Sequence, residues 1–152
     1  MRKAFVAIAL LAAASCGGAA GQSASSPAPG SPAPTVTVMV ANNAKLGKIL
    51  VDGNGRTLYL FEADKGPSST CYGACASYWP PLLTGGQPLA GTGANASLLS
   101  MAKRSDGTTE VTYGGHPLYY VVTDHNPGDA SGENVTNFGA AWFVVGVDGN
   151  KI

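Results

Sequence analysis

Short runs of alternating hydrophobic and polar residues recur along most of the chain, separated by turn residues. Val36, Val38 and Val40 alternate with Thr35, Thr37 and Met39, which is the period of a half-buried strand. Glycine-bearing turns such as Asp52–Gly55 supply the positive φ that tight reversals need. Together these signals indicate an antiparallel, mainly β domain. The predicted strands are Thr35–Ala41, Lys48–Val51, Thr57–Phe61, Leu98–Lys103, Glu110–Tyr113, Pro117–Val122 and Ala141–Val147.

One segment lacks this alternation and predicts a short helix. The residues from Thr70 to Trp79 contain no run of branched side chains, and Pro80 and Pro81 follow directly. Thr70 is a suitable capping residue, and the two prolines would end the helix. The corresponding segment of the second half, around 135–142, lacks the cysteines and is richer in Gly and Ala.

The chain repeats itself at an offset of sixty residues. Leu58-Tyr59-Leu60-Phe61-Glu62-Ala63-Asp64 has its counterpart in Leu118-Tyr119-Tyr120-Val121-Val122-Thr123-Asp124. A fixed offset indicates one supersecondary unit built twice. We predict repeat one at about 35–84 and repeat two at about 97–150. A lone hairpin is marginal in water, so the two repeats should pack as one pseudo-symmetric domain, 35–152, as a sandwich or a partly closed barrel. Large aromatic side chains should supply its core, namely Tyr59, Tyr119, Tyr120, Trp79 and Trp142.

The N-terminus predicts export and a lipid anchor. Arg2 and Lys3 precede an apolar run that is too short to span a bilayer, so residues 1–15 are typical of a signal peptide. The run Ala13-Ala14-Ser15-Cys16 resembles a bacterial lipobox, which directs acylation of the cysteine and cleavage before it. The alternative, a plain secretory signal, leaves Cys16 as an odd thiol. We expect an extracytoplasmic protein that is anchored to the bacterial cell membrane through lipidated Cys16.

Composition defines the linker and limits the partners. Residues 17–34 contain only Gly, Ala, Gln, Ser and Pro, so 16–34 cannot bury enough surface to fold and should act as a tether. Removal of the signal peptide leaves seven basic and nine acidic residues, a net charge of about −2. Neither sign is concentrated, whereas a nucleic-acid-binding protein needs a basic patch. We therefore expect no nucleic-acid partner.

Several ordered motifs resemble one known family. They are Tyr59-x-Phe61-x-x-Asp64, Cys71–Cys75, Trp79-Pro80-Pro81 and, in the second half, Gly115–Tyr120 and Pro127-Gly128-Asp129. Together they resemble the bacterial predicted lipoproteins built from a secreted repeat with a Tyr-x-aromatic-x-x-Asp motif. The second repeat departs from this pattern at Val121 and Phe143. The resemblance covers about 45–150 and implies location and architecture, because the family is of unknown function.

Cys71 and Cys75 remain as a pair once Cys16 is acylated. In an extracytoplasmic protein such a pair normally forms a disulfide. A Cys-x-x-x-Cys spacing within one continuous helix is unfavourable for the bond, so we expect Cys71 at or before the helix start. A structural disulfide is the first interpretation. A redox-active pair is the alternative, although redox motifs use Cys-x-x-Cys.

Catalytic and metal-binding patterns are weak. Asp64 and Asp124 end the repeated strand and should bond backbone amides of the following loops. His116 and His125 are the only histidines, too few for a typical transition-metal site, and the loop Asp124–Asp129 lacks the distal Glu of a calcium loop. No Gly-x-Ser-x-Gly is present. We expect no metal and no cofactor.

Three functional hypotheses follow from the sequence. The first is a non-enzymatic binding or interaction protein at the cell envelope, whose envelope-protein or small-molecule partner is unknown. Tyr72, Tyr78 and the Pro80-Pro81 edge are candidates for its contact surface. The alternative is a redox or electron-transfer accessory protein using Cys71 and Cys75. A hydrolase is least favoured, because no acid–base pair can be named.

Overall fold

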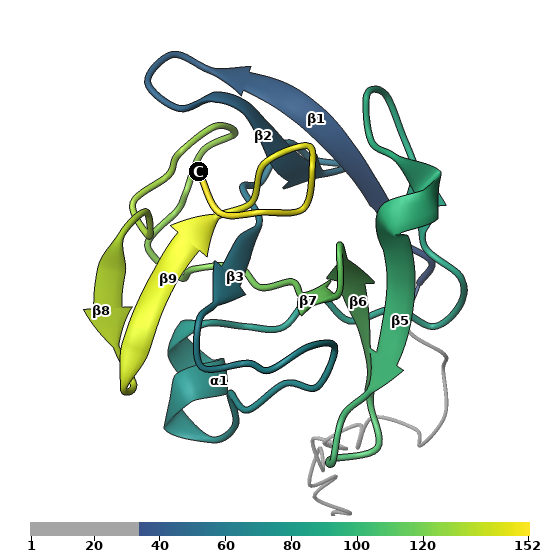
Figure 1. Ribbon diagram of the computed structural model, residues 1–152, viewed down its shortest axis with the longest axis vertical. Coiled ribbons are helices and arrows are strands. Elements are labelled where there is room, and N and C mark those ends of the chain that lie inside the picture. The colour runs from purple at the N-terminus through teal and green to yellow at the C-terminus, as the bar shows by residue number, and fades with distance from the viewer. Residues whose placement is uncertain (1–33) are drawn as a thin grey trace, which may run out of the picture. The chain divides into compact units, whose positions relative to one another are not determined.

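The computed structural model describes residues 34–152. The predicted signal peptide, the lipidation residue Cys16 and linker residues 17–33 lie outside these described residues. Within 34–152 the strands form three small sheets, ordered β2-β1-β4, β3-β9-β8 and β5-β6-β7 (Figure 1). The strands are β1 Thr37–Asn43, β2 Gly47–Asp52, β3 Tyr59–Phe61, β4 Leu89–Ala90, β5 Leu99–Lys103, β6 Thr109–Tyr113, β7 His116–Pro117, β8 Val135–Asn137 and β9 Ala140–Val144.

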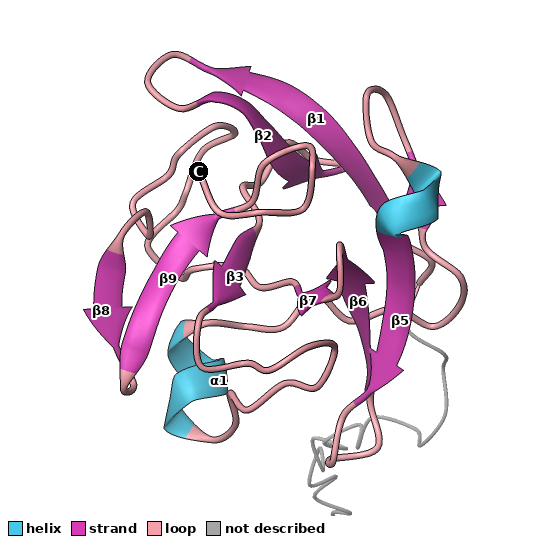
Figure 2. Cartoon of the chain, in the orientation of Figure 1, coloured by secondary structure: helices cyan, strands magenta, loops and turns pink. Residues whose placement is uncertain are grey.

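The mainly β prediction is confirmed, with two differences in the strands. The predicted strand Pro117–Val122 is regular only at β7, and Tyr119 beyond it forms isolated bridges with Tyr59 and Pro81. Proline has no N–H for a ladder, so the partner segment at Pro80-Pro81 limits the pairing to single bridges. Two short strands, β4 and β8, were not predicted. Between strands the chain runs mostly in loops and turns (Figure 2).

The predicted short helix exists but begins later than expected. Helix α1 spans Ala74–Tyr78 and follows Gly73, whose φ is +57° and which contributes no side-chain cap. The prediction that Thr70 caps this helix is wrong, because Gly73 occupies the N-cap position; Thr70 instead donates its N–H and hydroxyl to Asp64. Cys71 therefore precedes the helix and Cys75 lies within it. A 3₁₀ turn, η1, spans Ala96–Leu98.

The central strand of each repeat pairs with a segment of the other repeat. The backbones of Tyr59 and Tyr119 form two reciprocal N–H···O bonds of 2.9 Å. Strand β3 of the first repeat pairs with β9 of the second, and the segment after β7 pairs with the Trp79–Leu82 region of the first, as in the 2.8 Å bond from Tyr120 N–H to the Pro80 carbonyl. Each tyrosine strand thus completes its hydrogen bonding with the tryptophan segment of the other repeat. Figure 1 shows β3 between β9 and β7.

The core lies on both sides of this pairing. Tyr59 and Phe61 face one buried cluster, and Leu58 and Leu60 face the other, as the alternation of a strand requires. Both clusters draw on both repeats, so neither repeat has a separate interior. Within residues 34–152, no helix is long and apolar enough to cross a membrane.

Candidate functional site

The repeated tyrosines and aspartates bond crosswise between the repeats. The Tyr59 hydroxyl donates to Asp124 Oδ2 at 2.5 Å, and the Tyr119 hydroxyl donates to Asp64 Oδ2 at 2.6 Å. All four residues are buried. Burial, together with the Asp124 hydrogen bond, raises the pKa of Tyr59, while burial and the nearby Glu110 raise the pKa of Tyr119. Both phenols are therefore neutral donors at physiological pH.

The second oxygen of each aspartate fixes the loop that follows it. Asp64 Oδ1 accepts from the N–H and the hydroxyl of Thr70, each at 2.7 Å. Asp124 Oδ1 accepts from the N–H and the hydroxyl of Ser131, at 2.9 and 2.6 Å. Each of the four carboxylate oxygens thus accepts a hydrogen bond. The predicted hydrogen bonds from backbone amides to these aspartates are present. The hydrogen bonds from the tyrosines of the opposite repeat were not predicted from the sequence.

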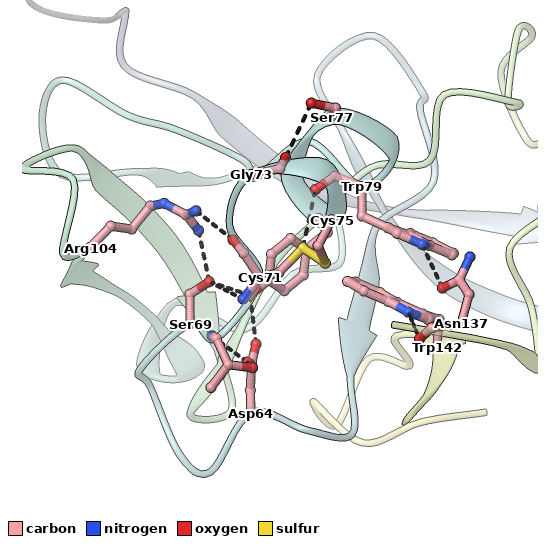
Figure 3. The surroundings of a disulfide bond; sticks show 12 residues. Asp64, Ser69, Cys71, Gly73, Cys75, Ser77, Trp79, Arg104, Asn137 and Trp142 are labelled. Carbon is pink, nitrogen blue, oxygen red and sulfur yellow. Dashed lines mark hydrogen bonds between the residues drawn. A yellow bond between two sulfur atoms is a disulfide. The ribbon is translucent and has the colours of Figure 1, made fainter. Parts of the chain in front are cut away.

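The tryptophans that close the two repeats stack at the centre of this region. The rings of Trp79 and Trp142 lie 4.0 Å apart and are inclined by 1°. Trp79 Nε1–H donates to the Asn137 side-chain oxygen at 2.9 Å, and Trp142 Nε1–H to the Asn137 carbonyl at 3.3 Å. Figure 3 shows both indoles directed toward Asn137. The stack therefore joins the two repeats and holds the β8–β9 turn beside them.

The Cys71–Cys75 disulfide lies beside the tryptophan stack. Its Cα atoms are 5.3 Å apart, within the usual range for the bond. Cys71 is fully buried and Cys75 is 7% exposed. The bond ties the Asp64–Cys71 loop to α1, which carries Tyr78 and leads into Trp79 (Figure 3).

A buried ion pair from the second repeat supports the same loop. Arg104 Nη1 lies 2.6 Å from Glu110 Oε2, and both side chains are almost completely buried. Arg104 also donates to the Cys71 carbonyl at 2.7 Å and to Ser69 Oγ at 2.8 Å. Glu110 Oε1 has no hydrogen-bond partner among the described residues. Burial raises the pKa of Glu110 to about 8, although Arg104 opposes the shift.

Three exposed hydrophobic side chains form what we call the aromatic corner: Tyr78, Val122 and Phe138. They are 38%, 42% and 47% exposed. The Tyr78 and Phe138 rings lie 6.4 Å apart, and Val122 N–H donates to the Tyr78 carbonyl. Tyr78 also packs edge-on against Trp79 at 5.9 Å. The aromatic corner therefore contacts the buried tryptophan stack through Tyr78.

Phe138 occupies an unfavourable backbone conformation. Phe138 and Gly139 form the two-residue turn between β8 and β9, and their φ angles are +52° and +92°. Positive φ at both central positions is the pattern of a type I′ turn, which favours Asn-Gly. A bulky side chain in this region costs about 1–2 kcal/mol. The turn would be more stable with Asn or Gly at this position, whereas the phenyl ring of Phe138 is 47% exposed.

Other predicted candidates contribute less to a site. Tyr72 lies under Arg104, whose guanidinium carbon is 4.4 Å from its ring centroid, and its hydroxyl accepts from Ser105 N–H. His125 is exposed, whereas His116 is half-buried and its Nδ1 lacks a hydrogen-bond partner among the described residues. In the same part of the chain, no group of three or more His, Cys, Asp or Glu residues is arranged to hold a metal ion.

A hollow of about 590 Å³ lies between the β1–β2 turn and the loop 128–133. Its polar groups mainly hold turns together. Asn43 Oδ1 accepts from the N–H groups of Lys45 and Leu46, and Asp129 Oδ2 accepts from those of His125 and Asn126. The aromatic corner is the stronger candidate, because its three side chains are exposed and hold no turn together.

Sequence reasoning identified Tyr78 but missed Val122, Phe138, Arg104 and Glu110. The Phe138-Gly139 pair between two short runs was a usable signal for a hairpin turn. No local pattern distinguishes Arg104 and Glu110 from surface charges, since their burial depends on the loop of the other repeat.

The model of a protein family described as a secreted repeat of unknown function matches the chain twice, over residues 40–83 and 100–146. This match confirms the predicted two-repeat organisation and the family that the sequence motifs resemble. The family description also supports an extracytoplasmic location. No curated protein and no solved structure matches the chain.

Proposed function

Because the chain belongs to this family of secreted repeats, we propose that it is a non-enzymatic interaction module held at the cell envelope by lipidated Cys16. The proposed anchor rests on the lipobox-like run ending at Cys16, and residues 17–34 would serve as the spacer. The folded repeats would then present the aromatic corner to an envelope protein with a complementary apolar surface.

The strained Phe138 is the observation that carries this proposal. Backbone strain persists where the surrounding structure imposes it, and it clusters at functional positions. Phe138 stabilises the fold less than asparagine would at the same φ, and 47% of its surface remains exposed. Contact with a partner gives this ring a role that the isolated fold does not.

The support beneath the corner favours binding over chemistry. The tryptophan stack, the disulfide and the Asn137 hydrogen bonds fix the position of Tyr78 and Phe138 before a partner arrives. Preorganised aromatic anchors lower the entropic cost of association. The burial of Cys71 and Cys75 favours a structural disulfide over the redox-active alternative, because exchange requires access to a sulfur atom.

A photocrosslinking experiment tests the proposed surface. A benzophenone amino acid replaces Phe138 in the full chain, and irradiation of intact cells should produce one dominant adduct. An excess of unlabelled wild-type protein should compete for the partner and reduce adduct formation at least tenfold. An excess of the unlabelled Phe138→Asn variant should leave adduct formation unchanged. Leu89→Ser is the matched control, because Leu89 is 57% exposed but lies in β4, outside the corner. Equal competition by Phe138→Asn and wild-type protein would exclude the corner as the interface.

The proposed anchor has a separate test. Mass spectrometry of the mature chain should find acylated Cys16 at its N-terminus, and Cys16→Ser should move the protein from the membrane fraction to the medium. An unmodified Cys16 would remove the anchor from the proposal and leave the aromatic corner untouched.

A further inference from the structure

A continuous series of aromatic rings leads from the surface to the crossing of the two repeats. It begins at Tyr78, which is 38% exposed and 5.9 Å from Trp79 between ring centroids. Trp79 stacks on Trp142 at 4.0 Å. Tyr59 meets Trp79 edge-on at 5.4 Å, and Tyr119 meets Trp142 edge-on at 5.1 Å. Rings this close exchange single electrons readily, so the series is a connected path.

The hydrogen bonds of the rings differ in a way that gives this path a direction. The two indole N–H groups donate to the amide oxygens of Asn137, which are poor proton acceptors. The hydroxyls of Tyr59 and Tyr119 instead donate to the carboxylates of Asp124 and Asp64 at 2.5 and 2.6 Å. A tryptophan that loses an electron therefore keeps its proton, whereas a tyrosine has a base already in place.

We propose that these rings form a one-electron relay that carries an oxidising equivalent from Tyr78 through Trp79 and Trp142 to the buried tyrosines. The fitting oxidant is a peroxyl-type radical at the cell surface. It takes one electron from Tyr78 and one proton from solvent and becomes a hydroperoxide. Tyr78 releases its hydroxyl proton to solvent and takes one back when Trp79 reduces it. Tyr119 supplies the electron, its O–H proton moves to Asp64, and a neutral tyrosyl radical remains. Tyr59 and Asp124 can act in the same way.

An external phenol or thiol completes the cycle by returning one electron; it releases its own proton to solvent and becomes a phenoxyl or thiyl radical. The proton on the aspartate then moves back to the tyrosyl oxygen. The disulfide takes no part in these steps, and the relay does not depend on the proposed binding function. Tyr59 and Tyr119 are corresponding residues of the two repeats, so each half of the domain provides one end point.

The relay can be tested with photo-oxidised ruthenium tris-bipyridine as the one-electron oxidant. Transient absorption of the full chain should show a tryptophanyl radical that converts to a tyrosyl radical at a rate independent of protein concentration. Because Tyr78 lies beside Trp79 and could itself become the tyrosyl radical, the variants are compared in a Tyr78→Phe background. In that background, Tyr59→Phe/Tyr119→Phe should lose this conversion. The control Tyr113→Phe/Tyr120→Phe, which alters tyrosines outside the ring series, should retain it. Conversion that survives the first double variant would overturn the relay.

A second variant keeps the test decisive if the buried double variant does not fold. Asn137→Asp places a carboxylate at the Trp79 N–H and leaves both buried tyrosines in place. The tryptophan can then release its proton, so conversion to the tyrosyl radical should slow at least tenfold. An unchanged rate in this variant would show that proton acceptance does not direct the electron, and it would overturn the proposal.

Discussion

The Tyr59 hydroxyl lies 2.5 Å from Asp124 Oδ2, across a sequence separation of 65 residues. Tyr119 and Asp64 repeat this relationship with the roles of the two repeats reversed. Each aspartate also holds the loop of its own repeat. The strand motif is therefore a device that couples the loop of one repeat to the strand of the other.

Removal of one of these hydroxyls should destabilise the domain measurably. Tyr59→Phe and Tyr119→Phe each leave a buried carboxylate oxygen without its tyrosine donor, and hydrogen bonds to charged groups contribute about 2 kcal/mol. Urea unfolding should show this loss for both variants. Tyr113→Phe is the control, because the Tyr113 hydroxyl bonds only backbone groups, Asn95 N–H and the Val147 carbonyl, and should cost about 1 kcal/mol. Equal losses at all three positions would argue against a special role for the carboxylates.

The disulfide should contribute modest stability without determining the fold. Closing a loop as short as Cys71–Cys75 contributes about 2 kcal/mol in the chain-entropy model. The variant Cys71→Ala/Cys75→Ala should lose about this amount, while near-ultraviolet circular dichroism retains the signal of the stacked tryptophans. Trp79 keeps its contacts with Trp142, Tyr59 and Asn137 in that variant. Loss of the tryptophan signal would instead assign the disulfide a role in positioning the stack.

The buried Glu110 should give stability an unusual pH dependence. Burial raises its pKa from 4.5 to about 8. A carboxyl with a raised folded-state pKa stabilises the fold fully below its unfolded pKa, and this contribution is lost as the pH rises through the folded value. The stability of the wild type relative to Glu110→Gln should therefore fall between about pH 4.5 and 8.

Asp106→Asn is the control for this measurement. It also removes a carboxylate beside Arg104, but Asp106 is exposed and its pKa is lowered by hydrogen bonds from Thr108. The fall between pH 4.5 and 8 should persist in this variant. A relative stability that rises across the same interval would show that the Arg104 ion pair outweighs the burial of Glu110.

The sequence predicted the repeat, the tyrosine strands and the aspartate loops because these depend on local patterns. Strand alternation and the position of Asp64 before a turn are visible in a few consecutive residues. The partner of each tyrosine depends on how the repeats cross, and internal similarity says which residues correspond but not which ones touch. Phe138 was not predicted for a different reason: a phenylalanine is unfavourable at the positive φ of this turn, so its local sequence does not indicate one.

A glycine at the crossing provides the last test of the shared interior. A Cβ at Gly132 would lie 2.6 Å from a ring atom of Trp79 and 2.8 Å from one of Tyr59. Both rings are fully buried and cannot move aside, so Gly132→Ala should cost about 2 kcal/mol through overpacking. Gly53→Ala is the control, because its Cβ would meet only Thr37 at 3.7 Å. If both variants unfold at the same urea concentration as the wild type, the loop of the second repeat does not pack against the tryptophan of the first as tightly as the fold requires.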